Sequence, residues 1–199
     1  MHSFQNRRTL IRQGVLIGIG LCAGASLTDE FDNGWMPLAN GQSPSSGAEK
    51  RLKELGIVLP QPPKPVAVYE PAVRVGNVLY TSGHGPNRPD GSSVQGKVGR
   101  ELTREQGYDA AKLVGMNILS TVRNTLGSLD KVVRLVKVLG LVNCTDDFAH
   151  QPQVINGFSE LMVQVFGEMA GKGARSAVGT NSLPNNIAVE IEAIFEVRE

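Results

Sequence analysis

Every odd position from 187 to 197 is apolar, and this regularity constrains the fold more than any other part of the sequence. The apolar residues are Ile187, Val189, Ile191, Ala193, Phe195 and Val197, and three of the even positions carry glutamate, namely Glu190, Glu192 and Glu196. Successive side chains of a strand point to opposite faces. The pattern therefore predicts a strand whose apolar face packs under helices and whose other face carries carboxylates.

The remaining periodicities predict strand, strand, helix, strand, helix, strand, strand. The predicted segments are a hairpin over 69–81 that turns at Gly76-Asn77, a helix over 103–127 opened by a Thr103/Gln106 capping box, a strand over 132–142, a helix over 154–169, and a closing hairpin that carries Arg175 and turns near 184–186. This order predicts an α+β domain with a mixed sheet and two long helices on one face.

The N-terminal part differs in composition from the rest. Residues 1–25 hold Arg7, Arg8 and Arg12, no acidic residue, and an apolar run that ends in Ala23-Gly24-Ala25. These features predict a signal peptide, and residues 6–12 resemble a twin-arginine motif, which implies export of a folded protein to the periplasm or beyond. The alternatives are an uncleaved anchor or a start codon placed too early, with a cytoplasmic protein. The apolar run is shorter than the ~20 residues of a spanning helix, so no stable membrane insertion is expected after processing.

Residues 26–50 are rich in Asp, Gly, Ser, Asn and Pro and are predicted to form a linker. At its end, Ser46 and Glu49 have the spacing of a capping box for a short helix that Gly56 ends. The folded domain is therefore predicted to span 51–199.

Charge restricts the possible partners. Loss of residues 1–25 removes three arginines and no acid, so the formal net charge falls from +1 to −2. Binding to a nucleic-acid backbone requires a basic surface, which this composition does not indicate. No nucleic-acid partner is expected, and a ribonuclease activity is disfavoured.

The segment Gly173–Val178, followed by Leu183-Pro184 and residues 189–194, closely resembles the C-terminal signature of the RidA/YjgF family. These proteins, also called endoribonuclease L-PSP or chorismate mutase-like, are small trimeric imine deaminases, and the resemblance covers about residues 50 to 199. It implies a chorismate mutase-like fold, a homotrimer with clefts between subunits, and hydrolysis of reactive 2-imino or enamine acids to 2-oxo acids and ammonia. It implies no metal and no cofactor.

The resemblance also assigns roles to single residues. Arg175 is expected to hold the carboxylate of a small metabolite, and Glu190, fifteen positions later, to position the hydrolytic water. Tyr69 is expected to close the pocket, and Ser82 and Gly83 of the Thr81-Ser82-Gly83 segment to line it. The alternative for Arg175 is a structural salt bridge to one of the carboxylates of the last strand, and the alternative for the glutamates is a solvated sheet face.

Three positions depart from the usual family pattern. Ala177 stands where many members have cysteine, so only its backbone amide can contribute to the site. His84 replaces a frequent glutamine and has either a structural role or a role in pH dependence. Asn156 is the nearest candidate for the family's helix asparagine, in a connection, 147–158, that is expected to be longer than usual.

These departures keep other functions open. A non-catalytic module that binds small carboxylates or senses metabolites would keep Arg175 without depending on Glu190. A chorismate mutase activity rests on fold analogy alone.

Overall fold

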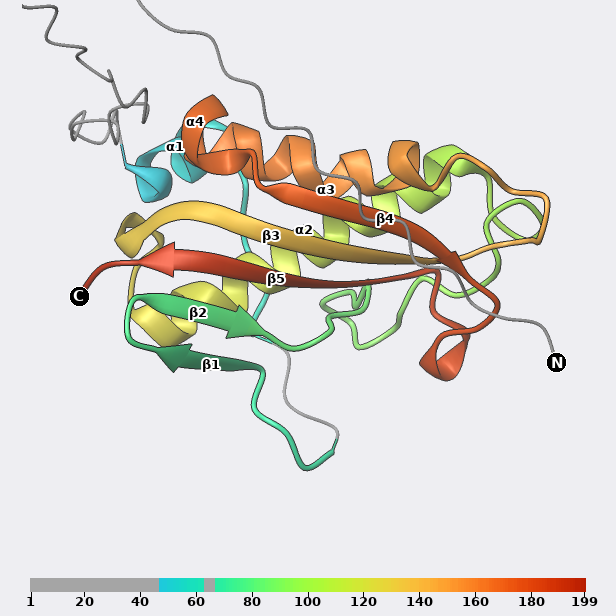
Figure 1. Ribbon diagram of the computed structural model, residues 1–199, viewed down its shortest axis with the longest axis horizontal. Helices are drawn as coiled ribbons and strands as arrows, with labels where there is room; N and C mark the ends of the chain where they lie inside the picture. Colours follow the sequence, from blue (N-terminus) through green and yellow to red (C-terminus); the bar gives the residue numbers. More distant parts are fainter. Residues whose placement is uncertain (1–46, 63–66) are drawn as a thin grey trace, which may run out of the picture. The chain divides into compact units, whose positions relative to one another are not determined.

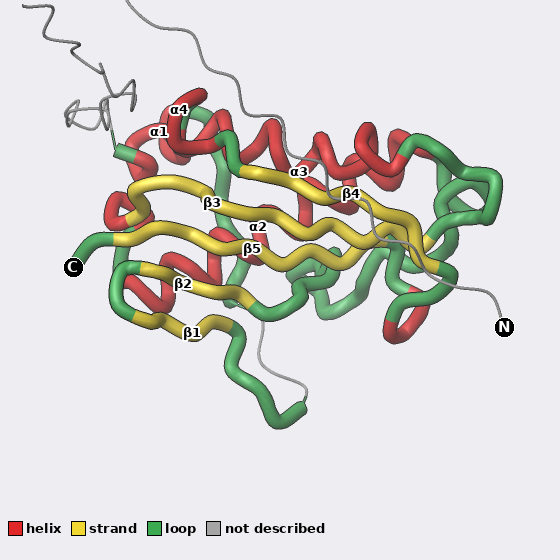
Figure 2. The backbone as a smooth tube through the Cα atoms, in the orientation of Figure 1, coloured by secondary structure: helices red, strands yellow, loops and turns green. Residues whose placement is uncertain are grey.

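A five-stranded mixed sheet forms one layer of the computed structural model, and helices cover one of its faces (Figure 1, Figure 2). The strands are β1 (Ala72–Val75), β2 (Val78–Thr81), β3 (Val132–Asn143), β4 (Ala174–Thr180) and β5 (Val189–Val197), in the order β1-β2-β5-β3-β4. Only the pair β3 and β4 is parallel. The structure describes residues 47–62 and 67–199, so the predicted leader and most of the predicted linker lie outside it.

Two long helices form the second layer, and short helical segments flank them. The long helices are α2 (Arg104–Leu126) and α3 (Gln151–Phe166), and the short segments are α1 (Ala48–Glu54), α4 (Glu168–Gly171), η1 (Leu129–Lys131) and η2 (Pro184–Asn186). Within the described residues, no helix has the length and apolar character needed to cross a membrane. The predicted α+β architecture is confirmed.

The capping box predicted for α2 is present. The Thr103 hydroxyl accepts a hydrogen bond from the Gln106 amide at 3.1 Å, and the Gln106 side chain accepts one from the Thr103 amide at 2.8 Å. The helix ends at Gly127, whose φ of 82° is a left-handed conformation that glycine adopts at little cost.

The helix α1 begins at Ala48, inside the predicted linker, and its cap position is Gly47, which makes no side-chain cap. The predicted partner Ser46 lies outside the described residues. Glu49 does not act as a capping residue here, because its carboxylate binds Arg123 at 2.6 Å and the Leu129 amide at 2.9 Å. This contact joins α1 to the end of α2 and to η1.

The helix α3 occupies 151–166 rather than the predicted 154–169. Its early start is compatible with proline in the first turn, where no backbone donor is required, and Gly167 ends it at a φ of 84°. Much of the predicted long connection over 147–158 is therefore helix.

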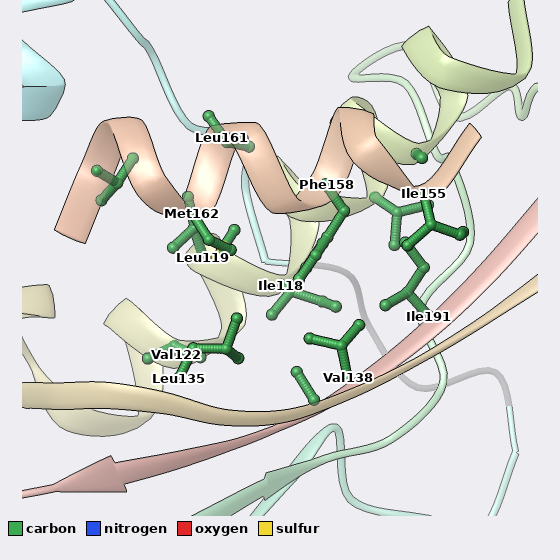
Figure 3. Close-up of a cluster of buried hydrophobic side chains, with 14 of the residues drawn as sticks. Ile118, Leu119, Val122, Leu135, Val138, Ile155, Phe158, Leu161, Met162 and Ile191 are labelled. Carbon is green, nitrogen blue, oxygen red and sulfur yellow. The ribbon is translucent and has the colours of Figure 1, made fainter. Parts of the chain in front are cut away.

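The core fills the space between the helices and one sheet face (Figure 3). The odd positions of β5 from Val189 to Val197 are all buried, as predicted. They meet residues of α2 and α3, including Ile118, Leu119, Ile155, Phe158 and Met162, each with no exposed surface.

The predicted closing hairpin is wrong, because β3 lies between β4 and β5. The helix α3 carries the chain over the sheet from β3 to β4, which makes these strands parallel, and β5 then returns antiparallel on the other side of β3. Arg175 and Glu190 are thus on strands that are not neighbours.

Candidate functional site

Glu190 is the acidic residue of a pocket of about 420 Å³ beside the start of β5. The pocket is lined by residues that precede β1, follow β2 and precede β5, among them Tyr69, Ser82, Gly83 and His84. The Glu190 side chain lies on the sheet face away from the helices, where it is half-buried. The structure thus brings together five of the predicted site residues.

The environment of Glu190 favours its neutral form. Burial raises the pKa of this carboxyl group above its ordinary value, and the like charge of Glu192 on the same face raises it further. A carboxylate with a raised pKa is a stronger base when ionised, and such groups occur at sites of proton transfer.

Gly83 lies against the Glu190 carboxylate. A Cβ atom at this position would lie 2.9 Å from the Glu190 Cδ and still closer to Oε1. A side chain at position 83 would therefore displace the Glu190 carboxylate, so this glycine helps to place it, a role that the predicted use of its amide does not include.

Ser82 and Tyr69 border the same pocket. The Ser82 hydroxyl donates a hydrogen bond to the Glu70 carbonyl at 2.6 Å, and so fixes the segment that carries Tyr69. Tyr69 is 43% exposed, which is typical of a residue at a pocket entrance and not of a core tyrosine.

His84 lines the pocket, but its ring is held inside the protein. One ring nitrogen pairs with the Ser82 carbonyl at 2.7 Å and the other with the Thr121 hydroxyl at 2.8 Å. Burial lowers the pKa of His84, although the Ser82 contact opposes this. Both nitrogens are engaged by the protein, so the ring serves to join the Ser82 loop to α2.

Arg175 lies in a different environment. It pairs with Val138 in the sheet, on the face that the helices cover, and one guanidinium nitrogen donates to Asn156 Oδ1 and Ser159 Oγ, both at 2.9 Å. Among the described residues, Arg175 forms no ion pair, so the alternative of a structural salt bridge finds no support there. A second pocket of about 430 Å³ lies along α3 and the start of β4, with Arg175 and Ser159 in its wall.

Asn156, the candidate for the family's helix asparagine, is bonded to Arg175 in the structure. Ser159 was not predicted, although it follows Asn156 by three positions and therefore shares its helix face. Ala177 pairs with Gly140 on the same covered face of the sheet and packs against the core. Asn156 and Arg175 thus form one group, and Ala177 lies on the same face of the sheet as Arg175.

The two groups of residues lie on opposite faces of the sheet. Arg175 aligns with Val138 and Ala193, which face the helices, whereas Glu190 aligns with Leu141 on the open face. No residue lines both pockets. A single copy of the described chain therefore does not place Arg175 and Glu190 around one small ligand.

Comparison with known proteins agrees with this arrangement of elements. The family model described as "YjgF/chorismate mutase-like, putative endoribonuclease" matches residues 49–195. The chain belongs to the YjgF family. This confirms the resemblance found in the sequence.

Several known proteins are similar to most of the chain. Protein TCP17 of Trypanosoma cruzi is 39% identical over 146 residues, which cover 73% of this chain and 91% of that protein. A 2-iminobutanoate/2-iminopropanoate deaminase of Dermatophagoides farinae is 32% identical over 142 residues, or 71% and 94% of the two chains. The crystal structure of Atu1372, a protein of unknown function from Agrobacterium tumefaciens, is 44% identical with a TM-score of 0.69, covering 76% and 94%.

Proposed function

We propose that the protein hydrolyses reactive 2-imino or enamine acids to 2-oxo acids and ammonia. The observation that carries this proposal is the half-buried Glu190 at the wall of a pocket. Its raised pKa and its close contact with Gly83 are suited to a base held in a fixed position. The similarity to a protein named 2-iminobutanoate/2-iminopropanoate deaminase supports it.

Arg175 is proposed to bind the substrate carboxylate. Its planar guanidinium can make two parallel charge-assisted hydrogen bonds to a carboxylate, which fixes the plane of the substrate. Asn156 and Ser159 bind one guanidinium nitrogen and orient the group. The other guanidinium nitrogens have no hydrogen-bond partner among the described residues and can bind the ligand.

Glu190 is proposed to move the protons. Its carboxylate takes a proton from water as the water oxygen attacks the imine carbon and passes this proton to the imine nitrogen, which gives a carbinolamine. Glu190 then takes the proton of the carbinolamine hydroxyl and delivers it to the leaving nitrogen as the C–N bond breaks, so that ammonia and the 2-oxo acid form and the carboxylate is restored. A raised pKa brings the acid and base forms of this group closer in energy at neutral pH.

The complete site is proposed to lie between subunits of a homotrimer. Since the two groups lie on opposite faces of one sheet, a cyclic arrangement would bring the Arg175 group of one copy to the Glu190 pocket of the next. The open sheet face supports this assembly, because it exposes Tyr80, Val73 and Val178, which a neighbouring copy would cover. Light scattering of the purified protein would test the trimer, and a monomeric mass would contradict it.

Variants of Arg175 and Glu190 would distinguish catalysis from simple binding. An amino-acid oxidase would generate 2-imino acids in situ, and their decay would be followed with the protein, with Arg175→Ala and with Glu190→Gln. Decay accelerated only by the unmodified protein would support both roles. Arg100→Ala and Glu105→Gln are matched controls at exposed positions, and both should leave the rate unchanged.

Carboxylate binding without any acceleration of imine decay, retained in Glu190→Gln and lost in Arg175→Ala, would instead indicate a binding module.

Export remains a separate proposal, which rests on residues 1–25. Cell fractionation with N-terminal sequencing would test it, and an intact Met1 in the cytoplasm would contradict it.

A further inference from the structure

The Glu190 pocket has a polar wall that no proposed catalytic step uses. This polar wall consists of Asn87, Ser93 and Asn185. We propose that it selects 2-imino acids whose side chain is neutral and carries an oxygen acceptor. The inference rests on the proposed deaminase activity and specifies its substrate class.

Asn87 is held in one orientation. Its backbone amide donates to the Gly85 carbonyl at 3.0 Å, and its carbonyl accepts from the side chain of Asn117, itself only 2% exposed, also at 3.0 Å. The Asn87 Oδ1 accepts the Ser93 hydroxyl at 2.6 Å. Within the described residues its Nδ2 has no partner, so its two donors remain for a ligand.

Asn185 lies on a loop that the protein holds firmly. Asn185 and Asn186 both have left-handed conformations, with φ of 53° and 55°, which asparagine tolerates better than most residues. Gln95 donates to the Asn185 carbonyl at 2.8 Å, and the fully buried Asn143 donates to Asn186 Oδ1 at 2.9 Å. These contacts maintain a conformation that would otherwise be costly.

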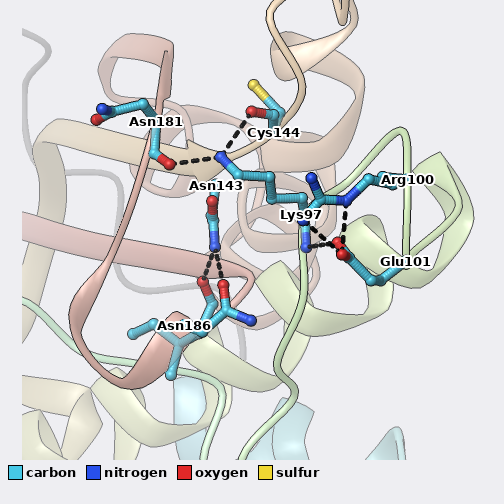
Figure 4. A network of polar contacts seen from close by, with 8 residues as sticks. Lys97, Arg100, Glu101, Asn143, Cys144, Asn181 and Asn186 are labelled. Carbon is cyan, nitrogen blue, oxygen red and sulfur yellow. Dashed lines mark hydrogen bonds and ion pairs between the residues drawn. The ribbon is translucent and has the colours of Figure 1, made fainter.

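A lysine anchors the beginning of the same loop (Figure 4). The Lys97 ammonium donates to the carbonyls of Asn181 and Cys144, while its backbone amide binds Glu101 at 2.8 Å. The polar wall is therefore built on fixed backbone, as specificity requires.

Glu190 and the polar wall belong to the same pocket. Gly83 and Gly85 line this pocket between them, in a segment that turns at Pro86, where the Asn87 amide bonds back to the Gly85 carbonyl. A Cβ at Gly85 would come within 3.0 Å of Ile187 and 3.7 Å of Asn87 Oδ1, so glycine leaves this passage free. A substrate reacting at Glu190 can thus extend its side chain past Gly85 to Asn87.

Charge decides between neutral and ionised side chains. Among the described residues that line the pocket there is no lysine or arginine, and Glu190 is the only carboxylate. The Arg175 that the next copy is proposed to contribute is occupied by the substrate's own carboxylate, so an acidic side chain would face Glu190 without a further cation, which is unfavourable in a partly buried site. A neutral acceptor meets the Asn87 donors without this penalty, whereas an alkyl side chain would leave them unpaired.

Two imines of equal length test the proposal. An amino-acid oxidase would produce them from O-methylhomoserine and norleucine, which differ in one ether oxygen in place of one methylene. We expect kcat/KM to be about tenfold higher for the ether, the effect of one net hydrogen bond. Asn87→Leu should abolish this preference, and Ser93→Ala, which frees the amide to rotate, should reduce it.

Asn124→Leu is the matched control, since it makes the same change at an exposed position of α2. Equal kcat/KM values for both imines, or a preference unchanged in Asn87→Leu, would overturn the inference while the deaminase activity stands. If neither imine is hydrolysed, the proposed function fails. Calorimetry with the corresponding stable 2-oxo acids would then test whether the polar wall determines binding. Tighter binding of the ether acid that is lost in Asn87→Leu would keep the polar wall as a binding determinant, and equal binding would remove it.

Discussion

The Glu190 carboxylate occupies the space that a Cβ atom at Gly83 would take. The carboxylate and the glycine belong to segments more than a hundred positions apart in the sequence, so this contact is a property of the fold. It fixes where the proposed base stands relative to the pocket.

Replacement of Gly83 by alanine should therefore move the base. The new methyl group would displace the Glu190 side chain by about 1 Å, and a shift of this size costs up to about 100-fold in rate. Steady-state kinetics would measure the loss, with the melting temperature as a control, because Gly83 is exposed and its φ is not positive. An unchanged rate would show that Glu190 has no positional role.

Glu192 is expected to influence the pH dependence of activity. Its charge contributes to the raised pKa of Glu190, after burial. Activity that requires ionised Glu190 rises with pH through this raised pKa, so Glu192→Gln should shift the acidic limb of the kcat/KM profile to lower pH. A shift in the opposite direction, or a limb that Glu190→Gln leaves in place, would contradict the assignment.

The same shift has a consequence for stability. A carboxyl group whose pKa is raised by folding favours the folded state at low pH, below its unfolded pKa, and this contribution is lost as the pH rises through the folded pKa. Glu190→Gln should therefore raise the melting temperature at pH 7 and have less effect near pH 4. Thermal unfolding at the two pH values would measure the difference, and a lower melting temperature at pH 7 would refute the expectation.

Ser159 is a positioning residue for Arg175. Ser159→Ala removes one of the two acceptors of the guanidinium nitrogen, so the substrate carboxylate should bind less well. We expect KM to rise about tenfold with a much smaller change in kcat, in keeping with one charge-assisted hydrogen bond. Ser159→Thr keeps the hydroxyl and should restore KM, whereas an equal loss in both variants would indicate a packing effect.

Local signals in the sequence predicted the elements well. The alternation of residues 187–197 predicted the buried face of β5, and the Thr103/Gln106 spacing predicted the start of α2. Both depend on neighbours within a few positions. The start of α3 was placed too late, because Pro152 interrupts the apolar pattern yet suits a first turn.

Strand adjacency could not be predicted in this way. The turn residues at 184–186 indicated a hairpin, but the position of β3 between β4 and β5 depends on contacts far apart in the sequence. The same long-range pairing decides that Arg175 faces the helices and Glu190 the open face. The buried state of His84 also depends on Thr121, which belongs to another element.

The separation of Arg175 and Glu190 on two sheet faces has a genetic consequence. If each cleft takes one residue from each of two copies, two inactive variants can complement each other. A mixed ring of Arg175→Ala and Glu190→Gln chains would contain one interface at which both contributing residues are unaltered. Co-expression of two defective alleles would then yield partial activity, a result that no site contained in one chain can give.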